Sequence, residues 1–511
     1  MDKVLSKSLS ITNTFTQEQI QEGISSWPKS LEICIKRANL FSTLQNAIIK
    51  SNPDFIINYQ FDRLENLSLQ LEPILREPTA TELEGYDQVH FTGNPWSGIN
   101  SIPFALTILA FYKTYIVPGF GILIPLLTCL LPFVLLKTFY NIPITFTEYT
   151  KILWRMWNGS PMPRRPEDLL IPPSPSPTDP LTQLRKMAQN GWTLFSFGQA
   201  VWQPIQQARH FSRLDSECLN LGRAVLEVKE IASNIFSKWK NFMPAWLSEW
   251  IQLCPSADRQ AFAFSIESPF WLPHLFRALG RFEFLYKLAS KEDVVPVQFV
   301  KSKKPVLMIK DFGDPSISMS SRIVSSIRMG ASSQQHAIVT GPNRGGKSSF
   351  MRGVLINVIL AHSFGAAFAD KAQMSYFSWI ADGLRLDDTP GELSMFEREV
   401  SFASSILNKR QGTGLILYDE LFHSTNPPDA IRTSKIFCKG LWRKKNCLSI
   451  ISTHIYELAK EAPKALVKPL CLASWKSGDD YQFSYTVQKG ICQISSVDLV
   501  LEQYGIKAAS L

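Results

Sequence analysis

The chain contains 511 residues, of which 45% are hydrophobic and 19% are charged, and its formal net charge at pH 7 is +9. One hydrophobic core rarely serves a chain of this length, so we expect two to four domains in a globular protein with an unusually apolar portion. The basic balance suits an anionic partner, either nucleic acid or an acidic membrane face, and does not choose between them.

Eight cysteines are scattered along the chain, and no Cys-x-x-Cys pair occurs. This distribution favours reduced thiols in a cytosolic protein over a disulfide framework or a zinc site. The N-terminal residues lack the long apolar run of a signal peptide.

Residues 1–90 are predicted to form an N-terminal helical region. Apolar residues recur at the spacing of one helix face, as in Leu31, Ile35, Leu40, Leu44 and Ile48. Such stripes are typical of core packing, and we assign no chemistry to them.

Residues 102–136 are predicted to form a transmembrane segment or hairpin, because Lys113 is their only charged residue. The 23 residues of 114–136 (136 − 114 + 1) would extend ~35 Å as a helix, enough to cross a hydrocarbon layer ~30 Å thick. Proline interrupts the run three times, and Pro118-Gly119 would suit the tip of a hairpin. The alternative is a helix buried in the core of a soluble protein.

The C-terminal flank of this segment is expected to face the cytoplasm, because basic residues follow it. They are Lys137, Lys151, Arg155, Arg164 and Arg165. Residues 158–180 are rich in proline and are predicted to form an extended linker.

Residues 181–300 are predicted to form a helical core or lever domain. Their aromatic residues alternate with basic ones, which would suit stacking on nucleic acid, but a helical bundle packed on itself is the better interpretation. These aromatic residues are Trp192, Phe195, Phe197, Trp202, Trp239, Phe242, Trp246 and Trp250.

Residues 301–511 are predicted to form an α/β ATPase domain. An apolar strand over residues 337–339 leads into Gly341-Pro342-Asn343-Arg344-Gly345-Gly346-Lys347-Ser348, and a helical pattern follows. This is the complete Gly-x-x-x-x-Gly-Lys-Ser/Thr sequence of a phosphate-binding loop in its required strand–loop–helix setting. Backbone N–H groups of such a loop surround phosphate oxygens, Lys347 would reach the β- and γ-phosphates, and Ser348 would bind Mg²⁺.

Two later apolar strands end in polar residues. The strand Leu415–Tyr418 leads to Asp419, which would hold Mg²⁺, and Glu420, which would polarise the attacking water. The strand that includes Ile450 and Ile451 leads to His454, which would sense the γ-phosphate.

Taken together, these motifs resemble the ATPase domain of the MutS mismatch-repair family over about residues 305–465. The matching residues are Thr340–Asn343, Gly345–Ser348, Asp419–Leu421, Ser452–His454 and Glu457-Leu458, with Asp387-Asp388, Gly391, Ser394, Phe396, Glu399 and Ile406-Leu407 in a segment similar to the signature of ABC-type ATPases.

The resemblance implies a P-loop fold of the ABC/MutS type, ATP hydrolysis with Mg²⁺, and a homodimer with composite sites. The implied nucleotide-binding residues are Gly341, Pro342, Asn343, Arg344, Gly345, Gly346, Lys347, Ser348 and Ser349, with Ser394 supplied by the second subunit. The implied metal ligands are Ser348 and Asp419, and the implied catalytic residues are Lys347, Glu420 and His454.

The chain departs from the family pattern at Arg344, Met395 and His423–Asn426, which bears on the hydrolysis rate and on coupling between sites rather than on nucleotide binding. Residues 1–90 also contain no Phe-x-Glu triplet, with which mismatch-reading members stack on the mispaired base.

We therefore expect a dimeric, membrane-tethered MutS-like ATPase that couples nucleotide state to clamp-like closure. Double-stranded DNA is its candidate partner, and its ATPase domain would lie on the cytoplasmic side of the membrane. One alternative is a soluble, cytoplasmic mismatch-repair or recombination factor whose apolar run is buried. Another is a nucleotide-gated scaffold that hydrolyses ATP weakly.

Overall fold

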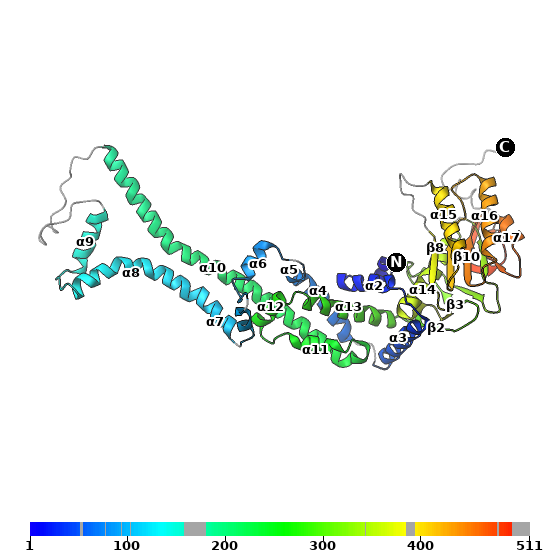
Figure 1. The fold of residues 1–511 in the computed structure, drawn as a ribbon, viewed down its shortest axis with the longest axis horizontal. Helices are drawn as coiled ribbons and strands as arrows, with labels where there is room; N and C mark the ends of the chain where they lie inside the picture. Colours follow the sequence, from blue (N-terminus) through cyan, green and yellow to red (C-terminus); the bar gives the residue numbers. More distant parts are fainter. Residues whose placement is uncertain are drawn as a thin grey trace. The chain divides into compact units, whose positions relative to one another are not determined.

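The computed structural model describes residues 1–51, 55–76, 78–93, 95–102, 104–157, 180–342, 344–384, 394–477 and 480–492. The chain divides into two compact units (Figure 1). The first unit combines Met1–Glu65, Ile235–Leu247 and His274–Leu511, and the second combines Asn66–Asn234 and Ser248–Pro273.

The first unit contains helices from both ends of the chain. They are α1 (Asp2–Ser8), α2 (Thr14–Ser25), α3 (Leu31–Ser51), α4 (Phe55–Gln70), α13 (Trp271–Ala289), α14 (Lys347–Phe364), α15 (Met395–Asn408), α16 (Pro427–Leu441) and α17 (Tyr456–Glu461), with the short 3₁₀ helix η4 (Lys240–Phe242). Helices α4 and α13 each continue into the second unit by a few residues.

The N-terminal helices of this unit interlock with its C-terminal part. Arg37 Nη1 donates to the carbonyl of His362 at 2.7 Å, and Trp27 Nε1 donates to the carbonyl of Phe377 at 2.9 Å. Gln45 Nε2 donates to the carbonyl of Val294 at 2.8 Å. Residues more than 240 positions apart therefore share one folded body.

Twelve strands are present in the described part of the first unit. They are β1 (Val294–Pro296), β2 (Gln298–Phe299), β3 (Val306–Phe312), β4 (Ser325–Gly330), β5 (His336–Thr340), β6 (Ala366–Phe368), β7 (Lys371–Met374), β8 (Trp379–Gly383), β9 (Gly414–Tyr418), β10 (Cys447–Ser452), β11 (Val467–Ser477) and β12 (Asp480–Lys489). They form sheets ordered β12-β11-β5-β10-β9-β8, β2-β7-β3-β4 and β1-β6.

The six-stranded sheet is parallel from β8 to β11, and β12 is added antiparallel to β11. Its central strands β5, β9 and β10 are buried at every residue, as parallel strands covered on both faces are. Leu417 and its neighbours on one face pack with α14, whereas Ile416 and Tyr418 on the other face pack with α15, α16 and α17. The chain segments that follow β5, β9 and β10 consequently emerge together at one edge of the sheet.

The second unit is helical among its described residues. Its helices are α5 (Glu72–Leu75), α6 (Ala80–Tyr86), the 3₁₀ helix η1 (Trp96–Ser101), α7 (Ala105–Phe111), the π-helical turn η2 (Tyr112–Ile116), α8 (Val117–Thr138), α9 (Phe146–Trp157), α10 (Pro180–Trp239), α11 (Trp246–Leu253) and α12 (Asp258–Glu267). The last residues of α10 and the first of α11 belong to the first unit.

The apolar segment forms one uninterrupted helical stretch, Ala105–Thr138, which is long and apolar enough to cross a membrane. The hairpin predicted at Pro118-Gly119 does not form. Pro118 lies in the first turn of α8, where its missing N–H costs little, and the preceding π turn η2 carries the helix across this point. None of the residues in its most apolar window is buried, so the helix is not a core helix of the unit.

The aromatic residues of 181–300 divide into two groups, and the bundle interpretation is right for only one. Trp239 is buried and packs with Phe282 and Tyr286 at ring-centroid distances of 5.9 and 5.5 Å. Trp192 and its neighbours on the N-terminal half of α10 are instead exposed, Trp192 by 70%. The spacing of these residues could not reveal this difference, because both groups have helical periodicity.

Several predicted features lie outside the described residues. They are the linker over 158–179, Asn343, Asp387-Asp388, Gly391 and the tail after residue 492.

Two buried histidines should make stability depend on pH. Burial lowers the pKa of His336 and of His362 to about 4. The unfolded chain then binds more protons than the folded chain between pH ~6.5 and ~4, so stability should be complete above this window and fall within it, by up to about 3 kcal/mol per histidine.

Urea unfolding of the full chain in mild detergent at pH 7 and at pH 5 would measure this fall. We expect His336→Gln, which retains a polar group beside Ser449 Oγ, to reduce the difference between the two pH values. An unchanged difference in this variant would contradict the assignment to His336.

Candidate nucleotide-binding site

A glycine-rich loop connects the buried strand β5 to helix α14. Arg344 and Gly346 both have left-handed backbone conformations, with φ values of +63° and +94°, and α14 begins at the next residue, Lys347. A side chain at Gly346 would be strained by this φ and would lie 3.4 Å from Leu472 and Tyr485. The loop therefore reverses the chain tightly and directs the N-terminus of α14 to the carboxyl edge of the sheet.

Lys347 lies at the centre of the site and is only 6% exposed. Its Nζ donates to the carbonyls of Gly341 and Pro342 at 3.0 and 3.1 Å and lies 3.1 Å from His454 Nε2. Burial lowers the pKa of Lys347, and the nearby carboxylates of Glu420 and Asp419 oppose that shift. The ammonium group is thus stabilised by the loop's own carbonyls and by the acids that follow β9.

Asp419 is connected to the glycine-rich loop and to β10. The exposed hydroxyl of Ser348 donates to Asp419 Oδ2 at 2.7 Å, and Ser452 Oγ donates to Asp419 Oδ1. The same Ser452 hydroxyl accepts from the backbone N–H of Glu420 at 3.2 Å. Ser452 therefore positions both acids, a role that its place in a motif did not reveal, because that role depends on β9 and β10 being neighbours.

Glu420 and His454 form a second contact at this edge. His454 Nε2 lies 3.3 Å from Glu420 Oε1, and this hydrogen bond lowers the pKa of Glu420. Nε2 of a neutral imidazole can either accept from Lys347 or donate to Glu420, so the location of one proton selects between the two contacts. Glu420 also has a φ of +53°, an uncommon conformation of the kind that is found at functional sites.

The predicted site residues of the three strands thus converge. Lys347, Ser348, Asp419, Glu420 and His454 form one continuous set of contacts. No group of three or more His, Cys, Asp or Glu side chains arranged to hold a metal occurs in the described ranges.

A cavity of about 260 Å³ adjoins the loop on the side away from Glu420. Arg344, Gly346 and Ser349, all predicted to bind nucleotide, contribute to its lining. Apolar and aromatic residues that the sequence motifs missed also line it, namely Phe312, Ile317, Ile323, Phe350 and Tyr485. Phe350 belongs to the first turn of α14, whereas the other four come from distant parts of the chain, so only the fold brings them to the loop.

Ser394 is not part of this set of contacts. It is exposed and caps the N-terminus of α15, where its hydroxyl donates to Glu397 Oε2 at 2.7 Å and accepts from the Glu397 N–H at 3.3 Å. This reciprocal arrangement is a capping box, which holds the start of the helix in place.

A buried carboxylate connects α15 to the loop that departs from the family pattern. Glu399 is fully buried, its Oε1 lies 2.8 Å from His423 Nδ1, and Ser424 Oγ donates to Oε2 at 2.6 Å. The motifs did not identify this connection, because Glu399 and His423 come from different elements. A further cavity of about 450 Å³ is lined by Glu420, His423 and His454.

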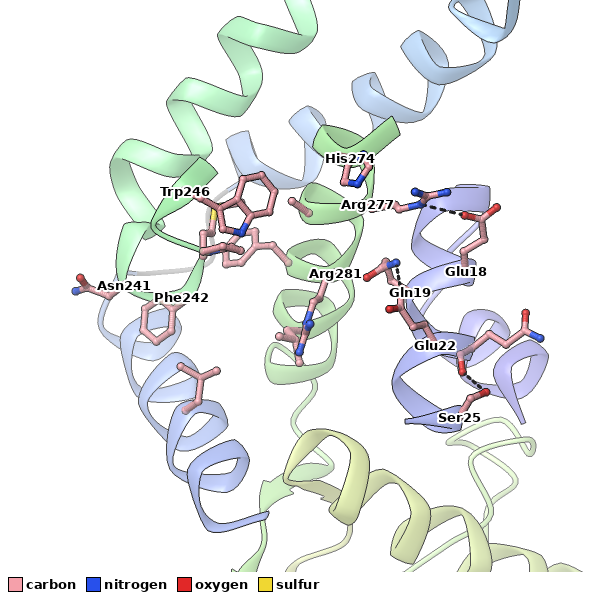
Figure 2. Close-up of a pocket in the computed structure, with 17 residues that line it drawn as sticks. Glu18, Gln19, Glu22, Ser25, Asn241, Phe242, Trp246, His274, Arg277 and Arg281 are labelled. Atoms are coloured by element: carbon pink, nitrogen blue, oxygen red, sulfur yellow. Dashed lines mark hydrogen bonds and ion pairs between the residues drawn. The ribbon is translucent and has the colours of Figure 1, made fainter. Parts of the chain in front are cut away.

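A larger cavity lies elsewhere in the first unit, between α2 and α13 (Figure 2), and measures about 1070 Å³. Two of its charged residues, Arg277 and Glu18, form an ion pair at 3.8 Å. It contains none of the predicted nucleotide-binding residues.

A glycine-rich loop with a buried lysine, paired acids and a histidine at the carboxyl edge of a parallel sheet are typical of domains that bind and hydrolyse nucleoside triphosphates. Residues 337–511 match the family model described as MutS domain V. This part of the chain is therefore similar to MutS domain V, the ATPase domain of that family.

The Ser452 hydroxyl offers a test of the site's geometry. Ser452→Ala should lower kcat for ATP by roughly 10-fold with a smaller effect on KM, because both acids lose a positioning hydrogen bond of about 1–2 kcal/mol. The matched control is Ser449→Ala, another buried serine of β10, which pairs with His336. Equal losses of kcat in the two variants would contradict a positioning role.

Proposed function

We propose that the chain is a Mg²⁺-dependent ATPase that works as a membrane-tethered dimer and couples its nucleotide state to closure of its helical arms. The observation that carries this proposal is the convergence of Lys347, Asp419, Glu420 and His454 within a MutS domain V.

The glycine-rich loop would act as the phosphate-binding loop, with the N-terminus of α14 directed at the phosphates. Lys347 would exchange its carbonyl contacts for phosphate oxygens. Ser348 and Asp419 fit a Mg²⁺ site, because their oxygens are already 2.7 Å apart and Mg²⁺ needs only one or two protein oxygens beside those of phosphate and water. When bound, Mg²⁺ would neutralise charge on the phosphates.

Glu420 would orient and polarise the attacking water, since its lowered pKa keeps it an acceptor at neutral pH. His454 would report hydrolysis. Its Nε2 lies between Lys347 and Glu420, so a lysine drawn to the γ-phosphate would free Nε2 to donate to Glu420.

A second subunit would complete the site through Ser394. This serine is exposed at a helix N-terminus, which is an arrangement suited to a γ-phosphate presented by a facing subunit. Glu399 would connect the sites, because it ties α15 to the His423–Ser424 loop next to Glu420.

Double-stranded DNA is the proposed partner, in a role related to mismatch repair. This proposal is supported by the MutS domain V and by the net charge of +9. Binding to duplex DNA should weaken steeply between 50 and 200 mM salt if phosphate contacts dominate. The absence of a Phe-x-Glu triplet from residues 1–90 leads us to expect no preference for mismatched duplex.

Membrane anchoring is proposed for the helical stretch Ala105–Thr138. Its exposed apolar surface favours a membrane over the alternative of a soluble factor with a buried apolar run. We expect the full chain to remain with membranes after alkaline carbonate washing and to be released by detergent. Recovery in the soluble fraction would contradict the anchor and leave the ATPase proposal intact.

Mixing two inactive variants would test the composite site. Lys347→Ala should abolish ATP binding, and Ser394→Ala should retain binding but lose most turnover. A mixed dimer holds one site with both residues intact, so exchange between equal amounts of the two variants should restore about a quarter of wild-type turnover.

Glu397→Ala is a control for the capping box, because it alters the same helix start and leaves the Ser394 hydroxyl in place. Absence of recovery in subunit-exchanged mixtures would contradict action of Ser394 across the dimer.

Glu399 offers a test of coupling between sites. Glu399→Gln keeps the shape and the contact with Ser424 but loses the charge that faces His423. We expect ATP binding at one site to be little changed and the cooperativity of hydrolysis to fall, measured as the Hill coefficient. An unchanged Hill coefficient would contradict the connection.

A further inference from the structure

We propose that the N-terminal half of α10 crosses the membrane beside α8, so that the two helices form an antiparallel pair of spans with α9 at their far end. This inference rests on the membrane anchoring proposed for α8 and identifies the return crossing. Among the described residues, hydropathy gives Ala105–Thr138 as the single candidate span and does not give α10, so the inference depends on how the chain is folded around α10.

The two helices carry charge-free windows of matching length. Residues 187–208 of α10 include 22 residues (208 − 187 + 1) without a formal charge, bounded by Arg185-Lys186 and Arg209. Residues 114–136 include 23 (136 − 114 + 1), bounded by Lys113 and Lys137. At 1.5 Å per residue these windows are ~33 and ~35 Å long, which matches the ~30 Å hydrocarbon layer of a bilayer.

The windows also begin at the same level. Lys113 Nζ lies 5.7 Å from the centre of the Phe211 ring, and a Cβ atom on Gly121 would lie 2.8 Å from Pro204 Cγ. From the first pair to the second, the residue number rises along α8, from Lys113 to Gly121, and falls by a similar amount along α10, from Phe211 to Pro204. The two helices therefore run antiparallel here. The two windows therefore start beside each other.

Side chains in both windows suit a hydrocarbon environment. No residue of 187–208 is buried within the unit, and Leu194 is 62% exposed. Hydroxyl groups on both helices donate to their own helix: Thr193 to the Gln189 carbonyl, Ser196 to the Trp192 carbonyl and Thr128 to the Pro125 carbonyl, at 2.8, 2.8 and 2.7 Å. Internal hydrogen bonds of this kind are what a lipid-exposed helix requires.

Chain connectivity requires a return crossing. Met1–Glu65, which precedes α7, and His274–Leu511, which follows α10, belong to one interlocked first unit, so both must lie on the same side of a membrane that α8 crosses. Helix α9 has 12 residues and could extend only ~18 Å. Between α8 and Pro204, the N-terminal half of α10 is the only helix within the described ranges that is long enough to return.

Four amide side chains of the window lie near its ends, namely Gln189, Asn190, Gln206 and Gln207, and two lie further in, namely Gln199 and Gln203. Amide side chains at such positions pair across helices in membranes. The return crossing puts Lys151 and Arg155 opposite the ATPase domain, contrary to the orientation that the basic residues predict. Shared anchoring of both helices in one folded unit would outweigh this charge bias.

The proposed occupant of these exposed faces is the lipid bilayer rather than a second copy or another protein. A bilayer requires both windows to match its thickness, and its anionic headgroups attract basic residues at the ends of the windows. Binding in a protein groove requires neither feature.

Cysteine accessibility would test the crossing in the full chain. The background is Cys129→Ser, since the other seven cysteines are buried. Single cysteines at three exposed positions, Ser26→Cys in the first unit, Thr147→Cys in α9 and Ser212→Cys beyond the window, would be labelled in intact and opened membrane vesicles with an impermeant maleimide. We expect Ser26→Cys and Ser212→Cys to react from one side and Thr147→Cys from the other.

Reaction of Ser212→Cys from the same side as Thr147→Cys, opposite Ser26→Cys, would overturn the return crossing and retain the α8 anchor. Reaction of all three from one side, with release by carbonate, would overturn the anchor itself and would fit a protein partner on these faces. Retained ATP turnover would confirm that each variant is folded.

A charge in the middle of the window gives a second measure. Phe197→Arg should lower the ratio of inserted to non-inserted α10 at least 10-fold, read from the share of chains in which Ser212→Cys reacts on the side opposite Thr147→Cys. Ser216→Arg, an exposed site on the same helix outside the window, should leave the ratio unchanged. Equal ratios in both variants would overturn the proposal.

Discussion

The candidate nucleotide-binding site depends on one buried ammonium group. Lys347 Nζ is almost fully removed from water, and an unpaired charge in such a place would cost several kcal/mol. Two carbonyls of the glycine-rich loop, the ring of His454 and the field of two carboxylates stabilise it. This requires the ends of three parallel strands to meet at one edge, which is why β5 lies next to β10, and β10 next to β9. The left-handed turn at Gly346 completes the arrangement by placing Lys347 at the first residue of α14.

From this edge, hydrogen bonds lead outward to a surface that a second subunit could reach. Ser452 fixes the two acids, and the buried Glu399 holds the loop that follows them to α15. The capped start of α15 exposes Ser394. A change at bound phosphates would therefore alter a helix that faces outward. Networks of this kind are cooperative, so removing one member should affect the rest more than its own hydrogen bond suggests.

Helix α10 connects the proposed membrane-spanning segment to the first unit. It is a single helix of 60 residues, or ~90 Å, whose N-terminal half carries the charge-free window and whose C-terminal end packs by Trp239 into the unit that contains the nucleotide site. Long helices transmit displacement better than loops do. An ATPase cycle that moves this end would thereby act on the membrane-embedded half without any additional partner.

The sequence alone identified the residues whose chemistry is local. The glycine-rich loop, Asp419-Glu420 and the apolar run before Lys137 are written in consecutive residues, so composition and spacing suffice to find them. What depends on strand order and helix packing came only from the tertiary structure. The role of Ser452 in positioning both acids became visible only when β10 was found beside β9. The exposed aromatic residues of α10 have the same periodicity as buried ones. The uninterrupted helix at Pro118 was equally hidden, because a proline in a first turn and a proline in a hairpin look alike until the neighbouring backbone is known.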